Sequence, residues 1–163
     1  MKKLLAALLA SASIIACSKD STSDTYTASF KSQPAQGKIK GAPFQYIAGK
    51  FEPDFYDDTE YGIYLYEKSD FDTVGLGGMC NSKFLGTKLG VDFSVPMKVG
   101  KYDLSDEQLV TFETGEMNVA LPRAVKGAIE VVSISDTKLV GKIDAYLSDE
   151  TFVNGDFTVE FCK

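Results

Sequence analysis

Apolar and polar residues alternate along most of the chain, and no stretch keeps the 3.6-residue period of an amphipathic helix. The alternating stretches are short and are separated by Gly, Pro, Asn and Asp, which favour turns. The pattern predicts strands at 38–44, 46–51, 62–67, 86–95, 101–104, 110–113, 118–121, 128–134, 138–146 and 156–162. Many short strands at close spacing are typical of an antiparallel β-sandwich or barrel. We therefore expect an all-β fold with a single domain.

The last predicted strand shows the alternation most clearly. Phe157, Val159 and Phe161 fall on one face, and Cys162 falls on the other. We expect an antiparallel hairpin whose apolar side covers a core, with the chain reversing between residues 148 and 155.

The N-terminus breaks the β pattern. Lys2 and Lys3 precede an unbroken run of apolar and small residues at 4–16, which stops at Cys17. Such a run is typical of a secretion signal, and it is too short for the roughly 20-residue helix that spans a bilayer. The end of the run, residues 14–17, resembles a bacterial lipobox, which implies that Cys17 is the lipidated first residue of the mature chain. The alternative is an ordinary signal peptide over 1–16, cut after a small residue.

Residues 18–25 contain no apolar side chain and are expected to act as a tether. The predicted organisation is a signal peptide at 1–16, a lipidated tether at 17–29 and an antiparallel β domain at 30–163, with the fold starting between Tyr26 and Phe30. A lipobox implies more than one acyl chain on the cysteine, which holds a protein stably on a membrane. Ser18 resembles the residue at that position in lipoproteins of Gram-negative outer membranes, so we expect the protein to lie in the cell envelope.

The chain is acidic, with 17 basic against 23 acidic residues and a net charge of −6. Cleavage before Cys17 would remove two lysines and no acid, which makes the mature net charge −8. A basic surface of the kind that binds nucleic acid is not expected, so nucleic acid is not an expected partner.

Three cysteines are present, and lipid on Cys17 would leave Cys80 and Cys162 as a pair. In an exported protein such a pair predicts a disulfide, closing a loop of about 80 residues that is worth on the order of 4 kcal/mol. The alternative is a reactive thiol at Cys80.

The sequence contains no histidine. This excludes Ser-His-Asp and Cys-His catalysis as well as zinc bound by histidine. A paired-carboxylate enzyme needs only two acids and stays open as an alternative, but no such pair is identifiable from the sequence. We expect a protein that is not an enzyme and needs no cofactor.

One acidic cluster stands out, formed by Asp54, Asp57, Asp58 and Glu60. Calcium is bound by several oxygen ligands, which makes the cluster a candidate Ca²⁺ site. It lacks the order of residues of a calcium-binding loop, and the alternative is a solvated acidic turn.

The densest aromatic region surrounds this cluster. In the strand predicted at 62–67, Tyr64 and Tyr66 fall on the face opposite Ile63 and Leu65. With the aliphatic side inward, the two tyrosines stand on the outer face, and together with Tyr56 they form a candidate binding platform for sugar rings or a protein partner. The alternative is that the tyrosines only shield a sheet face.

Four turn and strand motifs suggest a family, namely Gly41-Ala42-Pro43-Phe44, Val99-Gly100-Lys101-Tyr102, Gly141, and Asn154-Gly155-Asp156-Phe157. With the lipobox and the polar tether, their order resembles small β-sandwich lipoproteins of uncharacterised function from Gram-negative bacteria, Bacteroidetes-like and myxobacterial ones included. The resemblance implies no catalytic residue. We expect a membrane-anchored, non-catalytic exported lipoprotein that acts as a binding or envelope component. The alternatives are a surface glycan-binding module with the tyrosine platform and a paired-carboxylate enzyme.

Overall fold

The computed structural model describes residues 26–67, 89–105, 109–116 and 119–162. Within these ranges the chain forms no helix, and therefore none of membrane-spanning length. The strands are β1 (Gln36–Ile39), β2 (Ala42–Gln45), β3 (Ala48–Pro53), β4 (Glu60–Tyr66), β5 (Leu89–Pro96), β6 (Gly100–Asp103), β7 (Val110–Thr114), β8 (Lys126–Ile134), β9 (Lys138–Ser148) and β10 (Thr151–Phe161). The predicted signal peptide, Cys17 and Cys80 lie outside the described residues.

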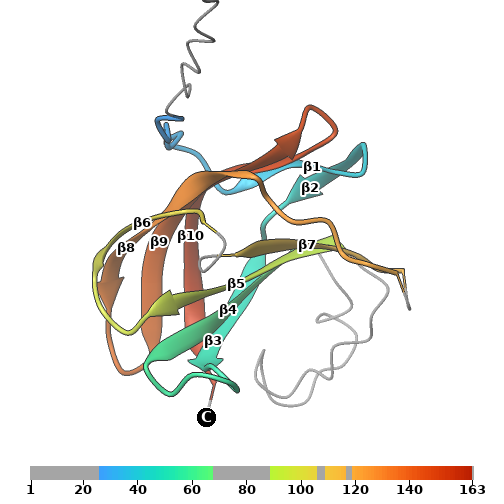
Figure 1. Ribbon diagram of the computed structural model, residues 1–163. Helices are drawn as coiled ribbons and strands as arrows, with labels where there is room; N and C mark the ends of the chain where they lie inside the picture. The colour runs from blue at the N-terminus through green and yellow to red at the C-terminus, as the bar shows by residue number, and fades with distance from the viewer. Residues whose placement is uncertain (1–25, 68–88, 106–108, 117–118, 163) are drawn as a thin grey trace, which may run out of the picture.

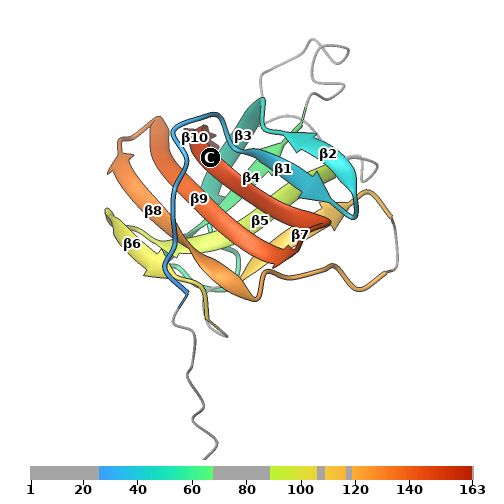
Figure 2. The same ribbon diagram turned by 90° about the horizontal axis from the view of Figure 1, so that it is seen from above.

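The strands form one curled sheet in the order β6-β8-β9-β10-β3-β4-β5-β7, which confirms the all-β prediction (Figure 1). β10 is the strand on which the sheet turns, because one edge pairs with β9 while the other pairs first with β1 and then with β3. The β10–β3 pair is parallel, and the other strand pairs are antiparallel. Figure 2 shows β8, β9, β10, β1 and β2 in front of β3, β4, β5 and β7, so the two halves of the sheet face each other.

The core lies between these two halves. Because side chains alternate along each strand, every second residue points inward. The fully buried large side chains are Phe44, Phe51, Phe112, Phe157, Ile39, Ile63, Leu65, Ile129, Leu139, Ile143, Val91 and Val95. Gly141 pairs with Phe157 on the neighbouring strand, and a methyl group at Gly141 would overlap the Phe157 ring. Phenyl and aliphatic groups thus fill this core, and the sites described below lie on the outer surface.

The strand predicted at 38–44 is two strands. Lys40 (φ 49°) and Gly41 (φ 80°) adopt left-handed backbone conformations and reverse the chain between β1 and β2. Gly41 meets that requirement without strain, whereas a lysine in this conformation is uncommon. The sequence prediction missed the turn because Lys40 is not a usual turn residue.

Two further boundaries differ from the prediction. The strand expected at 118–121 is not formed over residues 119–121, and Arg123 only makes an isolated bridge to Thr111. The C-terminal hairpin reverses at residues 149 and 150, so β10 starts at Thr151 rather than at Asp156. The hairpin itself was predicted correctly.

Residues 26–35, here called the N-terminal strap, cross the outer surface of the sheet (Figure 2). The Tyr26 hydroxyl and the Ser29 amide both donate hydrogen bonds to Asp144 Oδ2, at 2.6 and 2.8 Å. The side-chain amide of Asn154 donates to the Ser29 carbonyl at 2.9 Å. Asp144 and Asn154 are buried, so the strap satisfies polar groups that would otherwise lose their partners. Tyr26, at the early limit of the range predicted for the start of the fold, is therefore already packed on the sheet.

Candidate functional site

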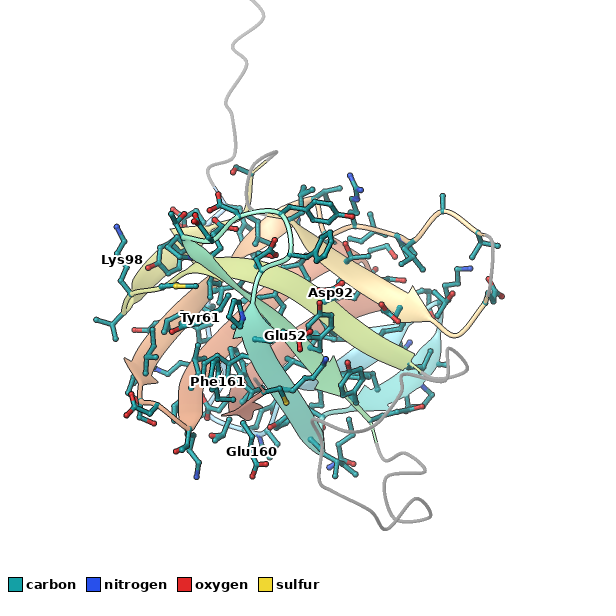
Figure 3. All side chains as sticks on the ribbon, turned by 90° about the horizontal axis from the view of Figure 1, so that it is seen from below. Glu52, Tyr61, Asp92, Lys98, Glu160 and Phe161 are labelled. Carbon is teal, nitrogen blue, oxygen red and sulfur yellow. The ribbon has the colours of Figure 1, made fainter. Side chains whose placement is uncertain are left out.

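The outer surface of β3, β4, β5 and β7 carries a mixed aromatic and charged face. Register places Lys50 opposite Tyr64 and Tyr64 opposite Asp92, in one row across three strands. The neighbouring side chains on this face are Glu52, Tyr66, Ser94, Thr111 and Glu113. We call this surface the tyrosine–carboxylate face. Figure 3 looks onto it, with Glu52 and Asp92 near its centre.

Tyr64 and Tyr66 lie on the predicted face, opposite Ile63 and Leu65, but they do not form an open platform. Their rings are nearly parallel, with centroids 6.5 Å apart and an interplanar angle of 9°. Lys50 Nζ lies 4.8 Å from the Tyr64 ring centroid. Tyr66 is only 6% exposed, so it cannot offer a ring face to a sugar. Within this pair, only Tyr64 stays partly accessible.

Tyr56 lies in the β3–β4 turn, where it is 93% exposed. A local period of two assigns Tyr64 and Tyr66 to a face, but it cannot give the depth to which neighbouring residues cover them. Because Tyr66 is buried, Tyr56, Tyr64 and Tyr66 do not form one open surface, and the platform prediction is corrected in this respect.

The tyrosine–carboxylate face disfavours the ionised form of its carboxyl groups. Burial, together with the charges of Glu113 and Asp54, raises the pKa of Asp92 to about 6, although Lys50 opposes this shift. Burial also raises the pKa of Glu113. Lys50 itself pairs with Glu52, with Nζ 2.9 Å from Oε1. Sequence reasoning missed Asp92 and Glu113 because the two acids come from strands whose register only the fold reveals.

Side chains of the acidic cluster close the β3–β4 turn by accepting hydrogen bonds. Asp54 accepts hydrogen bonds from the amides of Tyr56 and Asp57, at 2.8 and 3.2 Å, and from Ser94 Oγ at 2.6 Å. Asp57 accepts from the amide and hydroxyl of Thr59, at 2.8 and 2.6 Å. The Ser94 hydrogen bond lowers the pKa of Asp54, and the Thr59 hydrogen bonds lower that of Asp57.

The other two acids of the cluster take no part in these turn hydrogen bonds. Asp58 is exposed, and burial with the charges of Asp57 and Asp54 raises the pKa of Glu60. Across the parts of the chain that the structure describes, no three Asp, Glu, Cys or His side chains are grouped so as to hold a metal ion. The calcium site stays a prediction.

Two adjacent turns form an apolar end of the molecule. Phe55 is 91% exposed, and its ring lies edge-on to that of Tyr56, with centroids 5.1 Å apart and an interplanar angle of 86°. The β5–β6 turn lies next to them, because the Met97 amide donates to the Thr59 carbonyl at 3.1 Å. Met97 and Val99 in that turn are also exposed. We call Phe55, Tyr56, Met97 and Val99 the apolar tip.

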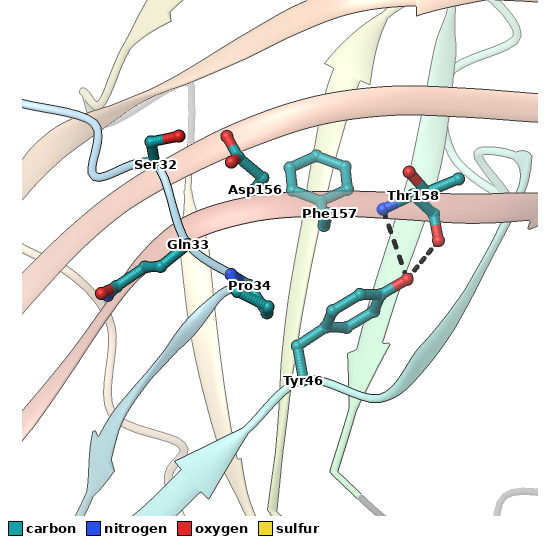
Figure 4. Close-up of a pocket in the computed structure, with 7 residues that line it drawn as sticks. All are labelled: Ser32, Gln33, Pro34, Tyr46, Asp156, Phe157 and Thr158. Atoms are coloured by element: carbon teal, nitrogen blue, oxygen red, sulfur yellow. Dashed lines mark hydrogen bonds between the residues drawn. The ribbon is translucent and has the colours of Figure 1, made fainter.

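A shallow pocket of about 320 Å³ lies on the outer surface of β10 (Figure 4). It is lined by Ser32, Gln33, Pro34, Tyr46, Asp156, Phe157 and Thr158. The Tyr46 hydroxyl accepts a hydrogen bond from the Thr158 amide at 3.3 Å and donates to the Thr158 carbonyl. The Tyr46 hydroxyl is therefore engaged by protein groups and is not available to a ligand in this pocket.

Cys162 follows β10, and its amide donates to the Phe51 carbonyl at 2.8 Å. The sequence places the Cys162 side chain on the face away from the core, and the side chain is 2% exposed, so that face is covered at this position. Its predicted partner Cys80 lies outside the described residues, and the disulfide stays a prediction.

Comparisons of the chain with protein-family models, with curated proteins and with solved structures found no match.

Proposed function

We propose that the protein is an exported lipoprotein, held on a membrane of the cell envelope by lipid on Cys17, and that it acts there as a non-catalytic binding component. The anchor rests on the signal segment and on the residues 14–17 that resemble a lipobox. The packing of Tyr26 on Asp144 is compatible with it, because Tyr26, nine positions after Cys17, already belongs to the folded domain.

The observation that carries the binding role is the composition of the tyrosine–carboxylate face. Glu52, Asp92 and Glu113 share this face with the ammonium group of Lys50. Holding Asp92 ionised there costs folding free energy, since its pKa is raised to about 6. Strongly perturbed carboxyl groups on one surface are typical of functional sites. The negative face beside a partly exposed tyrosine favours a cationic group of a partner, such as lysine or arginine.

The non-catalytic role rests on the lack of histidine in the sequence and on the filled interior. Without histidine the usual general base near neutral pH is missing. Asp92 and Glu113, on neighbouring strands, are the acids on which a paired-carboxylate mechanism would have to depend. Hydrolysis of a chromogenic glycoside that disappears in Asp92→Asn would contradict the non-catalytic role.

Fractionation tests the anchor. Native protein should stay with membranes through detergent-free washing, whereas Cys17→Ser should appear in the soluble exported fraction. Ser23→Ala, which changes a nearby tether residue and keeps the cysteine, is the control and should stay with membranes. A membrane-bound Cys17→Ser protein would show that lipid on Cys17 is not the anchor.

Binding of a basic peptide tests the face. An immobilised hexa-arginine peptide should retain the protein at pH 7.5 and release it as the pH falls below 6, where Asp92 becomes protonated. Asp92→Asn should weaken retention at pH 7.5. Glu130→Gln, which removes an outer-surface carboxylate 3.2 Å from Lys142 Nζ, should not weaken it. Equal losses of retention in the two variants would show that the overall charge of the protein causes the binding, and would reject the site.

A glycan-binding module is the second candidate, favoured by the partly exposed Tyr64 next to carboxylates that can accept hydrogen bonds from sugar hydroxyls. This candidate predicts that neutral oligosaccharides retain the protein. Tyr64→Ala should abolish that retention, and a change of pH near 6 should not affect it. Retention on the peptide but not on the sugars would reject this candidate.

A further inference from the structure

The apolar tip holds an exposed pair of aromatic rings, those of Phe55 and Tyr56, whose centroids lie 5.1 Å apart. The aliphatic residues Ile47 and Val132 are exposed at separate places, and Val119, Leu121 and Val125 are exposed in the segment before β8. Phe55 and Tyr56 stand next to each other in the β3–β4 turn, and Met97 and Val99 are exposed in the β5–β6 turn, which contacts the β3–β4 turn through the Met97 amide and the Thr59 carbonyl. In Figure 1 the β3–β4 turn lies at the lower end of the molecule, whereas the first described residues lie at the upper end.

The two aromatic side chains are held in place by their turn. Asp54 accepts hydrogen bonds from the amides that follow Phe55, and Ser94 fixes the Asp54 carboxylate from the neighbouring strand. Thr59 closes the other side of the turn on Asp57. An ordered turn therefore presents two large aromatic groups to solvent, which is unfavourable unless a partner buries them.

We propose that the apolar tip inserts into the interfacial region of a neutral lipid bilayer, as a second membrane contact of the proposed lipoprotein. This inference rests on the proposed function in one respect, namely that lipid on Cys17 keeps the domain near a membrane.

Shape and area favour a bilayer over a second copy of the chain. One aromatic side chain buries about 150 to 250 Å², so the pair supplies about 300 to 500 Å². A stable protein interface needs about 800 Å² from each partner. A bilayer needs no complementary surface and accommodates projecting side chains.

The chemistry of the tip is that of the membrane interface. The Phe55 ring is wholly apolar, whereas the Tyr56 ring carries a hydroxyl that can remain among the headgroups. Lys98, between Met97 and Val99, can approach lipid phosphates by extending its long side chain. Asp57 and Asp58 are exposed next to the aromatic pair, and hydrogen bonds from Thr59 lower the pKa of Asp57. These carboxylates would be repelled by anionic lipid, so neutral lipid is the expected surface.

The length of chain before Tyr26 allows both contacts with one bilayer. The nine steps from Cys17 to Tyr26 span at most roughly 30 Å, whatever their conformation. A compact domain of this size is roughly 35 to 40 Å across. The two lengths are similar, so lipid on Cys17 does not prevent the far end of the domain from reaching the surface.

Flotation with vesicles tests the proposal in protein without lipid. The soluble exported Cys17→Ser protein is mixed with phosphatidylcholine vesicles and separated on a density gradient. We expect part of it to float, and the further changes Phe55→Ser and Tyr56→Ser to lower the bound fraction at least about tenfold. Val125→Ser, which removes an exposed apolar side chain elsewhere, is the matched control and should float like the parent. Equal melting temperatures would exclude unfolding as the cause.

The other outcomes overturn the proposal. These are no flotation of the parent, an equal loss in the Val125→Ser control, and binding only to vesicles that contain phosphatidylglycerol and only at low salt. Retention of the Cys17→Ser parent on an oligosaccharide array through Phe55 and Tyr56, without flotation, would assign the tip to a glycan instead. The anchor is tested separately, because native protein that washes off membranes contradicts lipid on Cys17 without changing the vesicle result.

Discussion

The Tyr26 hydroxyl donates a hydrogen bond of 2.6 Å to the carboxylate of Asp144, which lies 118 positions later and is 5% exposed. The same oxygen of Asp144 accepts the Ser29 amide at 2.8 Å. Lys126 Nζ lies over the Tyr26 ring, 5.3 Å from its centroid. A buried carboxylate is costly unless it is paired or hydrogen-bonded, so this contact fastens the first described residues to the sheet.

Tyr26→Phe should therefore destabilise the domain by about 1 to 2 kcal/mol, because it removes one donor from a buried carboxylate. Urea unfolding at pH 7 measures the loss. Tyr146→Phe is the matched control, since its hydroxyl also donates to a carboxylate, that of Asp149 at 3.0 Å, but in an exposed pair. The control should change stability by less than about 0.5 kcal/mol. Equal effects of the two changes would contradict the structural role of the strap.

Replacing Tyr66 should lower the free energy of unfolding more than replacing Tyr64. Tyr66→Ala removes a ring that is 6% exposed and should lower the free energy of unfolding by about 2 to 4 kcal/mol. Tyr64→Ala removes a partly exposed ring and should cost less. Thermal or urea unfolding of the variants measures these losses. Tyr56→Ala is the control and should leave stability almost unchanged, because Tyr56 is 93% exposed. A small effect of Tyr66→Ala would restore the open platform that the sequence predicts.

Local alternation made the faces of the strands predictable. Ile63 and Leu65 point inward, as do Phe157 and Val159, because successive residues of a strand point to opposite sides whatever the rest of the fold does. The all-β class followed from the same pattern. The turn at Lys40 was missed because its left-handed conformation is unusual for lysine.

The candidate surfaces depended on register, which local patterns do not contain. Tyr64 meets Lys50 and Asp92 only because β3 and β5 flank β4 in the sheet. The β5–β6 turn meets the β3–β4 turn for a similar reason, through the hydrogen bond from the Met97 amide to the Thr59 carbonyl. The acidic cluster is a different case, because the hydrogen bonds that Asp54 accepts from the amides two and three positions ahead are local and are typical of aspartate at the start of a turn.

The cysteine pair gives a prediction on covalent structure. Mass analysis of the exported protein without reduction should show Cys80 joined to Cys162. Cys80→Ser should then lower the free energy of unfolding by about 2 to 4 kcal/mol, because the loop between the cysteines is long. Reduction of the unmodified protein should lower stability to the same extent, which controls for the substitution itself. Two titratable thiols in freshly isolated protein would show that the pair is not joined.

Asp92 should make stability depend on pH. Its folded-state pKa is about 6, above the ordinary 3.8, so the folded state holds this proton more tightly than the unfolded state. The contribution of Asp92 to stability is then fully present below pH 4 and is lost as the pH rises through 6. Asp92→Asn should raise the free energy of unfolding at pH 7.5 by roughly 1 to 3 kcal/mol and change it little at pH 4. Urea unfolding at both pH values measures this, with the exposed Asp103→Asn as the control. A gain of equal size at both pH values would show that ionisation of Asp92 is not the cause.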